Sequence, residues 1–214
     1  MSESYEYYIQ LPFWELIAVI TALAYVVFAA RENIWCWPMA MLSTVIYTVV
    51  FYDVYLWSDS LLQVYYFGMA VYGWYCWRNI APSDPQSGFE SHQKIQSWSI
   101  FIHVKAIGIL TALAMLVGWL MDSYTPTSFP YLDALTTVFA VFATYLVTKK
   151  VLQNWLYWIA IDALSIYLYI EKDLLPTAVL FILYVIIAIY GYMKWQKAYD
   201  QKRSTMHDLS PESS

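Results

Sequence analysis

Two tryptophans and one aspartate have the residue types and the spacing of a binding site for a cationic aromatic ring. Trp155, Trp158 and Asp162 are spaced i, i+3 and i+7, which places them on one face of a helix. A carboxylate beside indole rings attracts a flat cation through its charge and through cation–π contact. The alternative is that this face packs inside the protein and that Asp162 hydrogen-bonds a neighbouring helix.

The run that carries these residues is long enough to cross a membrane. Val151–Ile170 is otherwise apolar and aromatic, and its twenty residues would span about 30 Å as a helix, the hydrocarbon thickness of a bilayer. A carboxylate at that depth costs about 2.5–3.5 kcal/mol to insert. Asp162 is therefore expected to face the protein interior or a water-filled cavity.

Four further residues are candidates for binding the same ligand: Trp37, Gln63, Tyr66 and Asn154. Gln63 and Tyr66 share a helix face, and an amide inside a membrane must find a hydrogen-bond partner, such as a sugar hydroxyl. Each candidate also has a structural alternative. A tryptophan can anchor the chain at the membrane interface, an asparagine can cap a helix, and a glutamine can bond to a neighbouring helix.

The composition is that of a membrane protein. Of the 214 residues 61% are hydrophobic, 20% aromatic and only 13% charged, which is too apolar for an ordinary soluble domain. Polar breaks leave seven apolar spans, which predict an all-α integral membrane protein formed by a single membrane domain over residues 1–214, with a polar tail at 196–214. The spans are about Trp14–Ala30, Ile34–Tyr52, Leu61–Trp77, Ile100–Leu120, Leu132–Thr148, Val151–Ile170 and Leu174–Trp195.

The basic residues predict the orientation of these spans. If the amino terminus lies outside and the spans alternate, ten bases fall on the inner side and only Lys172 on the outer side. That asymmetry is the positive-inside pattern, and it supports an odd number of spans. The ten inner bases are Arg31, Arg78, Lys94, Lys105, Lys149, Lys150, Lys194, Lys197, Lys202 and Arg203.

Two stretches of the sequence recur. Residues 33–38 resemble residues 154–159 at an offset of 121, and residues 72–77 resemble residues 190–195 at an offset of 118. The difference between the two offsets predicts a second copy that is three residues shorter in its outer loop. In this alignment Trp37 pairs with Trp158, and Asp162 pairs with the apolar Met41.

The recurrence predicts two three-helix units joined by one helix. Repeat 1 covers about 14–77, the linker helix about 100–120 and repeat 2 about 132–195. Because three spans and one linker restore the starting side, both units cross the membrane in the same sense. Transporters use such parallel repeats, with a binding site between the halves.

An enzyme is not indicated. His92, His103 and His207 are scattered, with no metal-ligand pair at helical spacing, and phosphate loops, nucleophile elbows and paired catalytic carboxylates are absent from the sequence. Cys36 and Cys76 lie in apolar spans and are expected to be packing residues. We expect no catalytic residue, no cofactor, no metal and no nucleic-acid partner.

Several of these motifs resemble one known family. Residues 33–38 (Asn-Ile-Trp-Cys-Trp-Pro), 60–67 (Ser-Leu-Leu-Gln-Val-Tyr-Tyr-Phe) and 72–77 (Tyr-Gly-Trp-Tyr-Cys-Trp) resemble the first half of the PnuC vitamin transporters. Residues 154–158 (Asn-Trp-Leu-Tyr-Trp) and 190–191 (Tyr-Gly) resemble the second half. The resemblance implies a bacterial inner-membrane facilitator with a SWEET-like 3+1+3 fold that assembles as a homotrimer. It also implies uptake of nicotinamide riboside, trapped by phosphorylation inside the cell without a coupling ion.

One residue departs from this resemblance. In the nicotinamide riboside carriers an asparagine is expected at the position of Asp162, and related members named PnuT carry thiamine. Both vitamins contain a cationic aromatic ring, so an acid at the site leaves both possible. The resemblance makes nicotinamide riboside the preferred substrate and thiamine the alternative. A proton-coupled carrier that uses Asp162 is a further alternative. A structural membrane subunit is the last one, although it would not account for an acid at mid-membrane.

Overall fold

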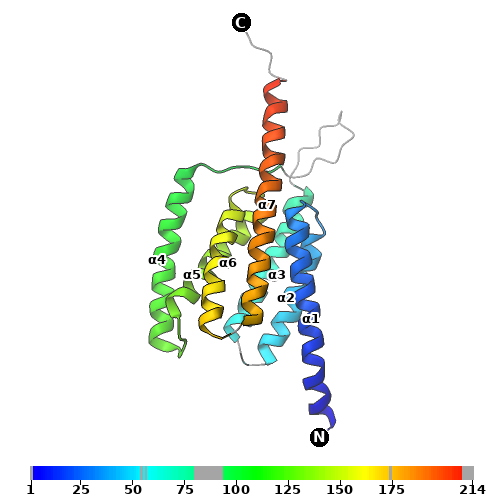
Figure 1. The fold of residues 1–214 in the computed structure, drawn as a ribbon, viewed down its shortest axis with the longest axis vertical. Coiled ribbons are helices and arrows are strands. Elements are labelled where there is room, and N and C mark those ends of the chain that lie inside the picture. Colours follow the sequence, from blue (N-terminus) through cyan, green and yellow to red (C-terminus); the bar gives the residue numbers. More distant parts are fainter. Residues whose placement is uncertain (1, 54, 56, 80–93, 174, 209–214) are drawn as a thin grey trace. The chain divides into compact units, whose positions relative to one another are not determined.

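The computed structural model describes residues 2–53, 55, 57–79, 94–173 and 175–208. Within these residues the regular structure is helical, apart from one isolated bridge between Gln96 and Val151 (Figure 1). The predictions of an all-α protein and of seven helical segments are confirmed, while residues 80–93 of the polar break predicted from Arg78 to Ser97 lie outside the described residues. The helices are α1 (Ser2–Ala30), α2 (Cys36–Asp53), α3 (Trp57–Asn79), α4 (Ile100–Tyr124), α5 (Pro130–Thr148), α6 (Asn154–Glu171) and α7 (Leu175–Asp208).

Four helices are long and apolar enough to cross a bilayer. Their apolar windows are Phe13–Ala30 in α1, Ile100–Tyr124 in α4, Pro130–Thr148 in α5 and Thr177–Gln201 in α7. Over the described residues α2, α3 and α6 fall short of that criterion, because indole, phenol and amide groups rank low in hydropathy. These three less apolar helices carry all seven of the predicted site residues.

The helix α4 is suited to contact with lipid. Only His103, Ala114 and Gly118 are buried along it, whereas apolar side chains such as Phe101 and Ile109 are 75% and 70% exposed. A helix that is apolar on nearly all sides belongs in a protein core or in a membrane. Because α4 is so exposed, the surroundings that fit it are the hydrocarbon chains of a bilayer.

The last helix runs further than the sequence predicted. Residues 196–208 of the predicted polar tail continue α7 as helix, and residues 209–214 lie outside the described part. The side chain of Gln196 donates to both carboxylate oxygens of Asp200, one turn on, at 3.0 and 3.1 Å. The sequence after Trp195 is polar but contains no glycine or proline before Pro211. Polarity therefore ends the apolar span here without ending the helix.

The chain forms two compact units, Met1–Gln93 and Lys94–Ser214. In the first unit α1 packs against α2 and α2 against α3; in the second, α4, α5, α6 and α7 pack in that order. Within each unit, consecutive helices run in opposite directions (Figure 1).

The two units contain the same three-helix pattern at a constant offset of 118 residues. Ala30 and Thr148 end matched helices, α2 and α6 have the same 18 residues in length, and α3 and α7 start at matched positions. The non-glycine residues with positive φ also match: Glu32 (56°) with Lys150 (50°), and Tyr55 (63°) with Asp173 (58°).

The first of these turns has the same hydrogen bonds in both units. After α1 the amide of Asn33 donates to Phe28 O at 2.9 Å, and after α5 the amide of Val151 donates to Leu146 O at 3.0 Å. The amide of the preceding residue, Glu32 or Lys150, donates to the carbonyl oxygen three residues earlier at 3.0 Å in each copy. This pair of bonds around a left-handed residue is a Schellman ending, which sets the direction of the next helix.

The predicted pairing of tryptophans is wrong. In the structure Trp37 lies over Gly73 and edge-on to Trp77, with ring centroids 5.2 Å apart, whereas its counterpart is Trp155 rather than Trp158. Trp155 lies over Gly191 and edge-on to Trp195, at 5.4 Å. The second copy is therefore not three residues shorter, since the offset of 118 holds throughout.

The reason for the error is physical. The sequence comparison aligned two segments that both begin with asparagine and contain tryptophans. In the fold, each equivalent tryptophan is instead identified by the glycine that makes room for its ring. A Cβ at Gly191 would lie 2.8 Å from the indole of Trp155, and one at Gly73 would collide more closely with Trp37. With the corrected offset the counterpart of Asp162 is Thr44, not Met41.

Candidate functional site

The helix α6 of the second unit presents a polar stripe. At 100° per residue, Asn154, Trp158, Asp162 and Ser165 fall within about a quarter of the helix circumference. The side chains of Asn154, Asp162 and Ser165 are buried, with exposed fractions of 0, 4 and 5%. Trp158 is only half-buried. Its indole and the carboxylate of Asp162 share a face of α6, as their spacing predicts.

The carboxylate of Asp162 is buried and unpaired. It forms no hydrogen bond or ion pair with any residue that the structure describes. A buried polar group without a partner is costly, and ionisable groups in membrane helices usually face the bundle interior, where they bind ligands, ions or protons. Asp162 is therefore the strongest candidate for contact with a ligand.

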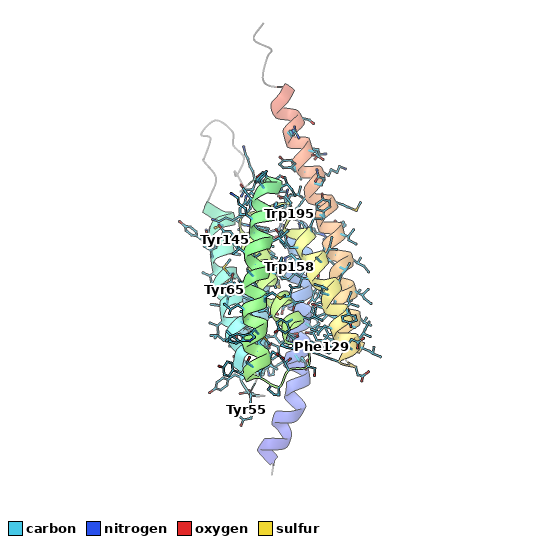
Figure 2. All side chains as sticks on the ribbon, turned by 90° about the vertical axis from the view of Figure 1, so that its left-hand side faces the viewer. Tyr55, Tyr65, Phe129, Tyr145, Trp158 and Trp195 are labelled. Carbon is cyan, nitrogen blue, oxygen red and sulfur yellow. The ribbon has the colours of Figure 1, made fainter. Side chains whose placement is uncertain are left out.

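The indole of Trp158 is half-buried and packs against the protein on one side. It packs against an apolar cluster formed by α5 and α6 and the segment before α6, together with Trp98, Phe139 and Phe142. Its remaining surface is available for stacking. The cluster consists of Ala140, Ala143, Leu146, Val151, Tyr157 and Ile161. Figure 2 labels Trp158 on α6 and Trp195 on α7, nearer the end at which α7 continues.

Trp155 and Trp37 are packed between helices in their respective units. Trp155 is 2% exposed between Gly191 and Trp195, and Trp37 is 1% exposed between Gly73 and Trp77. Neither indole N–H has an acceptor within the described residues. Their position differs from that of Trp158, because both of their ring faces are occupied by protein.

Asn154 occupies the first position of α6. Its side-chain amide donates to Val151 O at 2.7 Å, while its side-chain oxygen is buried and has no donor in the described chain. The side chain of Asn154 therefore does not cap α6, because capping needs its oxygen as acceptor, and that oxygen remains able to accept a hydrogen bond from a ligand.

Gln63 and Tyr66 lie on α3 of the first unit. They are three residues apart and half-buried, and the ring of Tyr66 is edge-on to Tyr65 with centroids 5.6 Å apart. Their polar atoms make no hydrogen bond with the described residues. Among the described residues, therefore, the predicted polar site residues without a side-chain partner lie on α3 in the first unit and on α6 in the second.

One polar contact of α6 was not predicted. The hydroxyl of Tyr157 and Nδ1 of His103 on α4 are hydrogen-bonded at 3.0 Å, and both side chains are buried. Gln153, just before α6, accepts from the amide of Trp98 at 3.2 Å, and the amide of Leu152 donates to Gln96 O at 2.8 Å. The segment before α4 and α4 itself are thereby fastened to α6. The partners are more than fifty residues apart, so helical spacing could not reveal them.

An ion pair closes the opposite end of the second unit. Nζ of Lys172 lies 3.0 and 3.2 Å from the two carboxylate oxygens of Asp133, and the hydroxyl of Thr127 donates to one of these oxygens at 2.9 Å. This links the start of α5 to the end of α6. Within the described residues there is no group of three or more His, Cys, Asp or Glu side chains that could hold a metal ion.

Comparison with known proteins gives consistent matches over both units. The sequence profile of the nicotinamide mononucleotide transporter family matches residues 12–197. The nicotinamide riboside transporter PnuC of Escherichia coli (strain K12) is 25% identical over 206 residues, which cover 85% of this chain and 84% of that protein. The riboflavin/roseoflavin transporter RibM of Streptomyces davaonensis is 22% identical, with 91% and 90% covered. The fold is similar to the crystal structure of the vitamin B3 transporter PnuC, with a TM-score of 0.70 at 20% identity over 88% of this chain and 83% of that one.

Proposed function

The chain belongs to the nicotinamide mononucleotide transporter family, and from this premise we propose that it carries nicotinamide riboside across a bacterial inner membrane. The substrate is that of relatives such as PnuC of Escherichia coli. The observation in this chain that carries a cationic aromatic substrate is the half-buried indole of Trp158 on the same face of α6 as the buried carboxylate of Asp162, and the relatives make nicotinamide riboside the first choice over thiamine.

These two groups suit a cationic aromatic ring. The pyridinium ring of the vitamin would stack on Trp158, where a desolvated cation–π contact contributes about 2 kcal/mol or more. The positive charge would also keep the Asp162 carboxylate ionised. Asn154 in the second unit, and Gln63 and Tyr66 in the first, stay proposed as substrate-binding residues, and the amide of Gln63 suits a sugar hydroxyl.

The proposed architecture is a 3+1+3 parallel repeat of the SWEET-like type, with α4 as the linker and all seven helices in the membrane. The constant offset of 118 residues supports it, since α1–α3 and α5–α7 have matched ends and matched turns. We further propose a homotrimer, which the family resemblance implies.

In this arrangement the amino terminus lies outside and the carboxyl terminus inside. Within the first unit, Arg31 follows the end of α1 and Arg78 lies in the last turn of α3, and these two helix ends lie at the same end of the unit. Within the second, Lys149 follows α5 at one end and Lys172 follows α6 at the other. Cysteines introduced at Ser213 and Ser4, with Cys36 and Cys76 replaced, test the orientation. We expect an impermeant reagent to label only the one at position 4 in intact cells, and the reverse pattern would overturn it.

We propose transport by facilitated diffusion, with phosphorylation of the vitamin inside the cell as the trap. Proteoliposomes without a kinase should then equilibrate labelled nicotinamide riboside without concentrating it. Accumulation driven by an imposed proton or sodium gradient would refute this mechanism and would favour the proton-coupled carrier. No specific uptake at all would favour a structural subunit.

Thiamine is the second candidate, and Asp162 is the residue that favours it. A carboxylate suits a compact fixed cation, whereas the family resemblance leads us to expect an amide at this position in nicotinamide riboside carriers. Binding of both vitamins to the purified full-length protein, measured side by side by calorimetry, separates the candidates. We expect nicotinamide riboside to bind more tightly, and the opposite order would transfer the proposal to thiamine.

A further inference from the structure

One hydroxyl group beside the proposed ring site has no partner. Seven serine and threonine side chains in the described residues are buried, and six of them donate a hydrogen bond to a backbone carbonyl; the exception is Ser165. The bonded six are Thr21, Ser43, Thr44, Ser60, Thr144 and Thr148. Ser165 is 5% exposed, so its hydroxyl lies in a largely enclosed position and has no protein partner within the described residues.

The position of Ser165 associates it with Asp162. The two residues are three positions apart on α6, so they share a face and lie about 4.5 Å apart along the helix axis. Asp162, at 4% exposure, is likewise without a partner among the described residues. An acid and a hydroxyl, both buried and both unpaired, thus follow each other on one stripe.

The first unit shows that helix packing does not require this pair. The counterparts on α2 are Thr44 and Tyr47. The Thr44 hydroxyl donates to Ala40 O at 2.8 Å within its own helix, and the Tyr47 ring stacks on Phe51 with centroids 5.3 Å apart. The first unit therefore builds the same helix pair positions with the hydroxyl of Thr44 satisfied inside its own helix and with an aromatic ring in place of the serine.

We infer that Ser165 determines specificity by hydrogen-bonding a hydroxyl of the substrate, one turn beyond the place where the ring lies against Trp158 and Asp162. The substrate class is then an aromatic ring, cationic in charge, with a hydroxylated sugar attached. A serine hydroxyl both donates and accepts, so it can pair with a sugar hydroxyl in either direction. This inference rests on the proposed function.

The test compares two ligands with the same cationic ring. N-methylnicotinamide has a methyl group where nicotinamide riboside has its sugar. With purified full-length protein, Ser165→Ala should lower the affinity for nicotinamide riboside about three- to tenfold, which corresponds to the loss of one neutral hydrogen bond. The affinity for N-methylnicotinamide should stay unchanged. Ser165→Thr, which keeps the hydroxyl, should restore most of the loss.

A matched control removes a hydroxyl with a known structural partner. Ser43 donates to Ala18 O at 2.9 Å, so Ser43→Ala should lower thermal stability without changing the ratio of the two affinities. If Ser165→Ala weakens both ligands by the same factor, or neither, the inference is wrong although the proposed function stands. If the unmodified protein binds neither ligand, the proposed function fails and the inference with it.

Discussion

In the first repeat the buried hydroxyl of Thr44 is hydrogen-bonded to its own helix, whereas at the matched position of the second repeat the carboxylate of Asp162 has no partner in the described chain. The last helix of each repeat, α3 or α7, shows the opposite difference, because there the first repeat carries the unpaired polar group. The amide of Gln63 on α3 is unpaired in the same sense, and its counterpart on α7 is Phe181, whose ring lies beside Tyr169 with centroids 5.1 Å apart.

The two repeats thus separate shape from chemistry. What they share is packing: a glycine that admits an indole, matched turns and matched helix ends. What differs is the helix that carries unpaired polar groups. A buried polar group without a partner destabilises the protein, so its presence on a single copy indicates a function that the other copy does not perform.

The largest expected effect concerns the packing that the repeats share. Trp37→Ala and Trp155→Ala should each lower the free energy of unfolding by about 3–5 kcal/mol, because each leaves a cavity against a glycine. Thermal unfolding in detergent measures both, with Trp119→Ala on the exposed side of α4 as the control that should change little. A large loss for only one of the two would break the equivalence of the repeats.

The second prediction concerns the charge that only one repeat carries. Removing one partner of a buried pair typically costs about 3–5 kcal/mol, which is more than a hundredfold in affinity. Asp162→Asn should therefore strongly weaken the binding of thiamine if thiamine is the substrate. If nicotinamide riboside is the substrate, its affinity should change little, since the family resemblance leads us to expect an asparagine there.

Calorimetric titration of both vitamins into the variant measures this difference. Thr44→Val in the first repeat is the matched control and should leave both affinities unchanged. If Asp162→Asn affects neither vitamin and Trp158→Ala also has no effect, α6 does not line the site.

A smaller effect should separate Trp158 from Trp155. Trp158→Ala removes a half-exposed ring face, so it should weaken vitamin binding by about 2 kcal/mol, or about thirtyfold, with a modest change in thermal stability. Trp155→Ala should show the reverse balance of affinity and stability. Equal effects of the two variants on both measurements would contradict the division between a stacking and a packing indole.

The smallest effect tests a link that is specific to the second repeat. Lys172→Val introduces the residue type of the matched position, Val54, and removes the ion pair with Asp133. The two side chains are 27% and 20% exposed, so the loss should be about 1 kcal/mol or less and should shrink at high salt. The unfolding temperature at two salt concentrations measures it, and a loss that is independent of salt would argue against an ion pair.

The sequence predicts the helices well and their ends less well. Polar breaks such as Glu171 to Asp173 coincide with turns, because a membrane excludes them from its interior. The same reasoning fails for α7 beyond Trp195, since a helix that leaves the apolar layer need not end there. Polarity reports the surroundings of a helix, whereas its end depends on backbone groups and breakers.

The candidate site is predictable only where it is local. Helical spacing alone places Trp158 and Asp162 on one face. It does not reveal that both faces of the Trp155 ring are covered, because the covering glycine is 36 residues away. A signal does exist in the sequence, since Trp37 precedes Gly73 by the same 36 residues. Ser165 also carried a local signal, its spacing from Asp162, but only the structure shows that its hydroxyl is unpaired.

The constant offset of 118 residues also limits where the chain can change in length. Between the matched prolines Pro12 and Pro130 and the matched tryptophans Trp77 and Trp195, neither copy has a net insertion or deletion relative to the other. One extra residue inside α6 ahead of Asp162 would rotate everything after it by about 100° and would turn Asp162 away from its present face. Length changes are therefore to be sought outside the copies, in residues 78–129 and at the two ends of the chain, where no helix of either copy would lose its alignment.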